Sequence, residues 1–161
     1  MQLYRFSPIG KKEQLLEAIL YVHATSSELC RKVVGEVYPI SSLTIFSHYF
    51  DEFEVLKSVQ AQMGTLVGGV FGPRVVLHEP LVVGEHAITH LRIRAPDPYH
   101  SHVGSNDYDI AEYKTFKEKY LSTYPHNLRL IEREGYELIE CWDPSFDVLG
   151  YVLSDPARSK R

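Results

Sequence analysis

The order strand, helix, strand, strand, strand is predicted twice along this chain of 161 residues. The run SLTIFSHY, residues 42–49, is rich in β-branched and aromatic side chains and predicts a strand, and a helix follows from Asp51 to Gly64. Three further strands are predicted by TLVGGVF, RVVLHEP and HAITHLRIR. The second half repeats this order with NDYDIAEY, a helix over residues 113–121, and the runs LRLIERE, YELIECW and VLGYVLS. The two units start about 60 residues apart.

This repeat favours a single α+β domain in which two β-α-β-β-β modules form a half-open cup. No low-complexity tract or Gly/Ser-rich linker divides the chain. The expected parts are a helical segment over residues 1–36, a first module over 42–94, a second module over 107–154 and a flexible tail over 155–161.

The helical segment carries an apolar stripe that includes Leu15, Ile19 and Val22. The run Thr25-Ser-Ser-Glu28 has the spacing of a capping box, so we expect a break into two helices near Thr25, with Gly35 ending the second.

Composition narrows the class of partner. The formal net charge of −4 and a pI near 6.0 argue against a dedicated nucleic-acid-binding protein, which normally has a basic face. No apolar run of about 18 residues predicts a membrane helix, and no secretory signal is recognisable, so a cytoplasmic protein is expected. A homodimer is left open. Cys30 and Cys141 lie in no metal-binding pattern and are expected to be buried or half-buried.

Side-chain alternation places ionisable residues on one face of the predicted sheet. In residues 87–94, Leu91 and Ile93 share one face while His90, Arg92 and Arg94 share the other. We expect helices to cover the apolar faces, leaving a polar inner face able to hold a small ligand or a metal. A sheet with one face in water would show the same alternation without any functional meaning.

The stretch VVLHEPLVVGEHAITHLRIRAPDPYHSHVGSNDYDI, residues 75–110, is similar to the YecM-type branch of the vicinal-oxygen-chelate (glyoxalase/dioxygenase-like) superfamily. In that branch a strand ending in Leu-His-Glu-Pro is followed by another strand, a proline-containing loop and a short acidic strand. The resemblance implies a cup in which four inward side chains bind a divalent ion, here zinc, nickel, manganese or iron. It also implies isomerase, epimerase, lyase or dioxygenase chemistry on a small oxygenated substrate.

The residues that match the family's ligand positions depart from its usual set. His48 matches the first ligand, His90 or a neighbouring arginine stands where a carboxylate is usual, and Asp109 stands where a histidine is usual. The final strand offers Tyr151 or nothing. An arginine cannot bind a cation because it keeps its proton. The predicted metal ligands are therefore His48, His90, Asp107 and Asp109.

Arg92 and Arg94 are suited to bidentate recognition of a carboxylate or phosphate. The alternative is pairing within the protein, with Asp97, Asp107, Asp109 or Glu140 as partners. Tyr99 and His102 in the loop are further candidates for substrate binding. His100 and His102 have a spacing that suits a metal on a strand, although two histidines in an exposed loop are the competing interpretation.

We therefore expect an enzyme, an isomerase, epimerase, lyase or relative that acts with or without a divalent metal on a small anionic, oxygenated substrate. His48, His90 and Asp109 would be its catalytic groups. The alternative function is a non-catalytic module with a degenerate metal site, which binds a metabolite or a protein partner.

Overall fold

The computed structural model describes residues 3–68 and 72–160. Within them lie three α-helices, α1 (Lys12–Val34), α2 (Phe50–Met63) and α3 (Tyr113–Tyr120), and a 3-10 helix, η1 (Pro156–Lys160). The strands are β1 (Ile40–Phe46), β2 (Gly64–Val67), β3 (Arg74–Val83), β4 (His86–Arg94), β5 (Gly104–Tyr108), β6 (Leu128–Arg133), β7 (Tyr136–Cys141) and β8 (Val148–Leu153). The predicted α+β class is confirmed.

All eight strands belong to one open, mixed sheet with the order β2-β3-β4-β1-β5-β8-β7-β6. β1 is parallel to β4 and β5 is parallel to β8, while β1 and β5 are antiparallel to each other. The strands β1 to β4 therefore occupy one half of the sheet and β5 to β8 the other, joined at β1 and β5.

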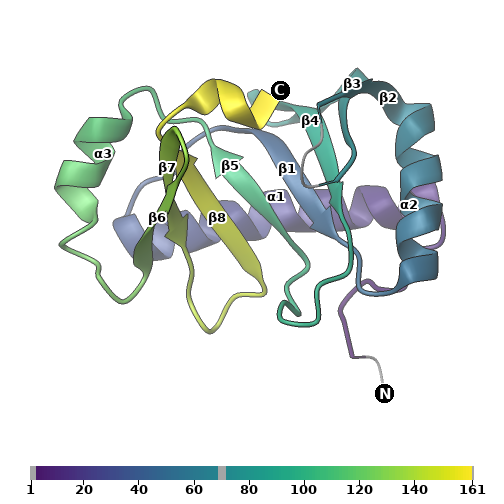
Figure 1. Ribbon diagram of the computed structural model, residues 1–161, viewed down its shortest axis with the longest axis horizontal. Helices are drawn as coiled ribbons and strands as arrows, with labels where there is room; N and C mark the ends of the chain where they lie inside the picture. Colours follow the sequence, from purple (N-terminus) through teal and green to yellow (C-terminus); the bar gives the residue numbers. More distant parts are fainter. Residues whose placement is uncertain (1–2, 69–71, 161) are drawn as a thin grey trace.

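α1 lies along one face of the sheet and contacts β1, β5 and β8 (Figure 1). Leu15, Ile19 and Val22 are fully buried in this contact, as the apolar stripe predicts. The expected break near Thr25 is wrong, because α1 continues without interruption to Val34. Ser26, Leu29 and Cys30 prolong the buried stripe, and packing against the sheet favours continuation over capping.

Other boundaries also differ from the sequence prediction. β3 runs through Pro80 to Val83, because a register shift between Val76 and Leu81 accommodates the proline, and the turn comes at Gly84 with φ 63°. The predicted strand NDYDIAEY lies earlier, at 104–108. Of the run TLVGGVF, residues 69–71 lie outside the described residues.

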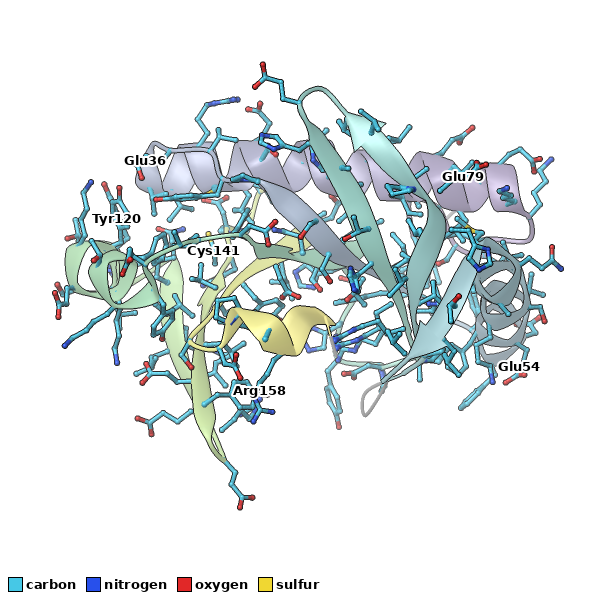
Figure 2. The ribbon with its side chains drawn as sticks, turned by 90° about the horizontal axis from the view of Figure 1, so that it is seen from above. Glu36, Glu54, Glu79, Tyr120, Cys141 and Arg158 are labelled. Atoms are coloured by element: carbon cyan, nitrogen blue, oxygen red, sulfur yellow. The ribbon has the colours of Figure 1, made fainter. Side chains whose placement is uncertain are left out.

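The C-terminal segment, expected to be a flexible tail, contains a short helix. Residues 156–160 form η1, which lies on the face of the sheet opposite α1 (Figure 2). The Nη1 of Arg74 donates to the carbonyl of Arg158 at 2.7 Å, and the Arg158 guanidinium lies 4.0 Å from the centre of the Tyr136 ring. Residue 161 lies outside the described residues.

Within residues 3–68 and 72–160, no helix has the length and apolar character needed to cross a bilayer.

Candidate functional site

The face of the sheet opposite α1 is called the inner face below. A Cβ built at Gly104 would lie 3.0 Å from Cγ2 of Val22 in α1, so Gly104 faces α1. Because strand side chains alternate, Ser105 and Asp107 face the other way. Directly paired residues on neighbouring strands have their side chains on the same face. The strand register therefore identifies the other residues of the inner face.

One row of partners crosses seven strands on the inner face. In sheet order it consists of Val76, His90, Ser42, Asp107, Tyr151, Glu140 and Arg129. A second row beside it consists of Arg74, Arg92, Thr44 and Ser105. Polar and ionisable side chains thus meet on one face from both halves of the chain.

η1 connects the two halves of the inner face. Arg158 contacts Arg74 on β3 and Tyr136 on β7, which are five strand intervals apart in the sheet order. Five intervals measure about 24 Å along a sheet, and side chains stand roughly perpendicular to it. The side chains of Arg74, Arg158 and Tyr136 together span this distance, and Figure 2 shows η1 between the two ends of the sheet.

Arg92 is the charged group at the centre of the inner face. Its side chain is half-buried, and burial lowers its pKa, while Asp107 and Tyr136 act in the opposite direction. Among the described residues its Nε has no hydrogen-bond partner, and no ion pair reaches its guanidinium. An arginine keeps its charge at any physiological pH, so this is a fixed cation able to accept an anion.

Asp107 lies on the neighbouring row, on the far side of β1 from β4. Burial raises its pKa to about 7, the charge of Arg92 opposes the rise, and Asp109 adds to it. Near neutral pH Asp107 therefore exists in both protonation states. This is the property expected of a general acid–base group, which must both donate and accept a proton.

The raised pKa of Asp107 predicts an unusual pH dependence of stability. In the unfolded chain its pKa would be about 4, so between about pH 4 and 7 the folded state holds a proton that the unfolded state releases. This contribution to stability is complete below about pH 4 and is lost as the pH rises through about 7. From pH 5 to pH 8 the free energy of unfolding of the wild type should therefore fall by at least about 1 kcal/mol more than that of Asp107→Asn, which has no such proton to lose. Urea denaturation at the two pH values measures both changes.

The control for this measurement is Glu118→Gln, an exposed position on α3. Its free energy of unfolding should follow the wild type at both pH values. Parallel pH dependences for Asp107→Asn and the wild type would show that Asp107 is already ionised in the folded protein.

The polar side chains of the row on β8, β7 and β6 bind to one another. The hydroxyl of Tyr151 donates to Glu140 at 2.9 Å, and Arg129 pairs with Glu140 at 3.1 Å. This contrasts with the guanidinium of Arg92, for which residues 3–68 and 72–160 supply no ion-pair partner. The available charge for a ligand is therefore at the β4–β1–β5 part of the row.

The structure separates the two predicted arginine anchors. Arg94 pairs with Asp97 at 2.5 Å, and its guanidinium lies 4.5 Å from the centre of the Phe46 ring. For Arg94 the internal pairing considered from the sequence is therefore what is found, and Arg92 alone stays available. Tyr99 is 91% exposed in the loop and forms no part of the inner face.

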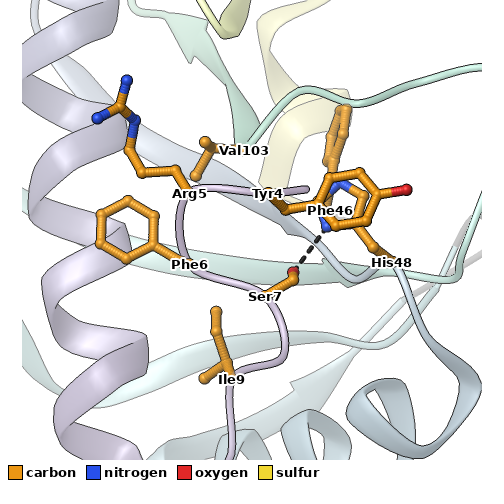
Figure 3. Close-up of a pocket in the computed structure, with 8 residues that line it drawn as sticks. All are labelled: Tyr4, Arg5, Phe6, Ser7, Ile9, Phe46, His48 and Val103. Carbon is orange, nitrogen blue, oxygen red and sulfur yellow. Dashed lines mark hydrogen bonds between the residues drawn. The ribbon is translucent and has the colours of Figure 1, made fainter. Parts of the chain in front are cut away.

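His48 lies two residues beyond β1 and belongs to a different environment (Figure 3). Its Nδ1 is 2.7 Å from Oγ of Ser7, its Nε2 is 3.0 Å from the carbonyl of His102, and the ring of Tyr4 stacks on it at 3.9 Å. A carbonyl only accepts, so Nε2 carries the hydrogen and Nδ1 accepts from Ser7. Burial, the main influence, lowers the pKa of His48. The adjoining hollow has no room for a water molecule.

The four predicted metal ligands do not converge. His90 and Asp107 flank Ser42 on one row, but Asp109 follows β5 at the Pro39 end of β1, while His48 lies beyond the opposite end. The length of β1 separates these ends by roughly 20 Å. Within the described residues no three His, Cys, Asp or Glu side chains are grouped as metal ligands. These four residues therefore do not fit a single metal site. Binding of a divalent ion stays a prediction, and no set of ligands is assigned to it.

Arg74, Tyr136 and Arg158 were not predicted as site residues. Nothing local in the sequence indicates that Arg74 lies opposite Arg92 on the neighbouring strand. Arg158 lies in the segment expected to be flexible. Only long-range strand pairing and the docking of η1 reveal these three residues.

A separate cleft of about 260 Å³ lies at α3, and its lining includes Tyr38, Phe116 and Tyr120. None of the predicted site residues lines it. It is therefore distinct from the inner face.

No protein-family model matches the chain, and no curated protein matches it. A solved structure described as "Structural Genomics, Protein EC4020" is similar, with a TM-score of 0.66 and 13% sequence identity. The match covers 95% of this chain and 92% of that one. At this identity the likeness shows the fold alone.

Proposed function

We propose that the inner face binds a small, oxygen-rich anion at Arg92 and that the protein catalyses a proton transfer on it, as isomerases, epimerases and lyases do. The observation that carries the proposal is the half-buried guanidinium of Arg92, whose Nε has no hydrogen-bond partner among the described residues. A buried charge without a partner is costly, and a bound carboxylate or phosphate would offset that cost.

Asp107 is the proposed acid–base group. It is separated from Arg92 by β1 only, and with a pKa of about 7 it can both donate and accept a proton at neutral pH. An anion held by Arg92 would lie beside this carboxyl group. In this proposal Asp107 takes the place of His48 and Asp109, which lie toward opposite ends of β1.

The half-open cup of two β-α-β-β-β modules and membership of the vicinal-oxygen-chelate superfamily form part of the same proposal. Their support is the strand order, in which each half of the chain supplies one half of the sheet, and the resemblance of residues 75–110. A polar inner face shared by two such halves is a suitable place for a small ligand.

Binding is tested by calorimetric titration of the wild-type protein with lactate, glycolate, pyruvate and malate. Arg92→Gln should weaken the binding of any ligand found by at least about tenfold, because a charged hydrogen bond is lost. The matched control is Arg129→Gln, which removes an exposed arginine on β6 and should leave affinity unchanged. Equal affinities for wild type and a folded Arg92→Gln variant would sink the binding site.

Catalysis is tested by proton exchange at carbon in D₂O, followed by NMR on each ligand that binds. Asp107→Asn should keep the ligand but lose the exchange. Arg92-dependent binding without exchange in the wild type would instead identify the non-catalytic, metabolite-binding alternative.

A further inference from the structure

We propose that Arg74 and Arg92 act together to hold a ligand with two anionic groups, and that η1 occupies this position until the ligand displaces it. This inference rests on the proposed function and specifies its ligand class and its control. It adds Arg74 to the binding site and gives a role to the C-terminal segment.

The two arginines lie directly opposite each other. Arg74 on β3 and Arg92 on β4 are Cα partners in an antiparallel pair, so their backbones are about 5 Å apart and their side chains share the inner face. Arg74 is only 3% exposed. Both guanidiniums carry a positive charge on the same face, so an anion between them would be attracted by both. Each guanidinium can bind one carboxylate through two parallel hydrogen bonds, so the pair suits a dicarboxylate or a phosphate group.

A main-chain oxygen already lies at this position. The carbonyl of Arg158 accepts from Nη1 of Arg74 at 2.7 Å, as an oxygen of a bound anion would. A neutral carbonyl is a weaker acceptor for a guanidinium than a carboxylate is. A dianionic ligand should therefore compete with η1 for Arg74.

Two contacts join Arg158 of η1 to the sheet. One is the hydrogen bond from Arg74, and the other places the Arg158 guanidinium 4.0 Å from the centre of the Tyr136 ring. The Arg158 side chain is 38% exposed, and its pairing with Asp155 at 3.8 Å lies within the C-terminal segment. Partly exposed cation–π contacts and ion pairs are weak in water. Since η1 lies on the inner face, its departure would uncover Arg74 while the sheet stays intact (Figure 2).

The test compares succinate with butyrate, which has the same number of carbons and one carboxylate fewer, in calorimetric titrations of the full chain at pH 8. Arg74→Gln should weaken succinate binding by about tenfold and change butyrate binding little. Arg158→Ala should strengthen succinate binding by up to roughly tenfold, the factor expected if η1 blocks the site about nine-tenths of the time. Tyr136→Leu, which removes the other side of the same contact, should also strengthen succinate binding. Arg133→Ala, an exposed arginine on β6, is the control.

The outcomes separate this inference from the proposed function. If anion binding depends on Arg92 while Arg74→Gln and Arg158→Ala change nothing, the two-arginine site and the control by η1 are overturned and the proposed function stands. If no variant, including Arg158→Ala, binds succinate, butyrate or any of the four acids named for the proposed function, both proposals fall. Succinate binding that appears only in Arg158→Ala or Tyr136→Leu supports occupation of the site by η1.

Discussion

Gly104→Ala is expected to destabilise the protein by about 3 kcal/mol or more, at the upper end for an overpacked site. A Cβ at this position would lie 2.3 Å from the carbonyl oxygen of Thr44 and 3.0 Å from Cγ2 of Val22. Thr44 belongs to β1, which pairs with β5 where the halves of the sheet join, so the contact is relieved only by moving the strands apart. Urea denaturation followed by circular dichroism measures the loss.

Gly10→Ala is the matched control. The nearest atom to a Cβ there is Oε1 of Gln14 at 3.8 Å, an ordinary contact, so the free energy of unfolding should change by less than about 0.5 kcal/mol. Equal unfolding midpoints for the two alanine variants would contradict the close packing of β5 against β1.

Glu52→Ala is expected to cost about 3 kcal/mol, because it leaves two main-chain N–H groups without their acceptor. The Glu52 carboxylate accepts from the N–H of Ile9 and from the N–H of His48, both at 2.6 Å, and the residue is 2% exposed. These bonds tie the segment before α1 to the start of α2. Thermal denaturation and protease cleavage within residues 3–9 should both report the loss.

Glu52→Gln separates the hydrogen bonds from the packing of the side chain. The glutamine keeps one acceptor oxygen and nearly the same volume, so it should retain one of the two bonds and lose about half as much stability. If the alanine and glutamine variants are equally stable and equally resistant to protease, Glu52 does not hold this segment.

Local patterns were sufficient for much of the fold. HAITHLRIR predicts β4 with both of its ends, because alternation and β-branched residues persist along it. Gly35 ends α1 with φ 78°, a left-handed conformation that favours glycine. The predicted break near Thr25 failed because a capping spacing is a local preference, whereas burial along the sheet acts on the whole helix.

The site was less predictable, because alternation gives the face of a side chain and not its neighbours. Arg92 and Arg94 share a face, yet one has no ion-pair partner among the described residues and the other pairs with Asp97. Arg74 and Arg92 come together through strand register, which the shift in β3 between Val76 and Leu81 makes impossible to count from the sequence. His48 was misplaced because β1 ends two residues before it.

The path of α1 across the sheet has a consequence for how the chain folds. α1 packs against β8, although more than a hundred residues separate the two in the sequence. During synthesis the part of its apolar stripe that packs on β8 therefore stays uncovered until the strand ending at Leu153 has emerged, although β1 and β5 are made earlier. Contacts over such sequence distances slow folding. Until β8 is made, this part of α1 is an exposed apolar surface on the nascent chain, at which aggregation can begin.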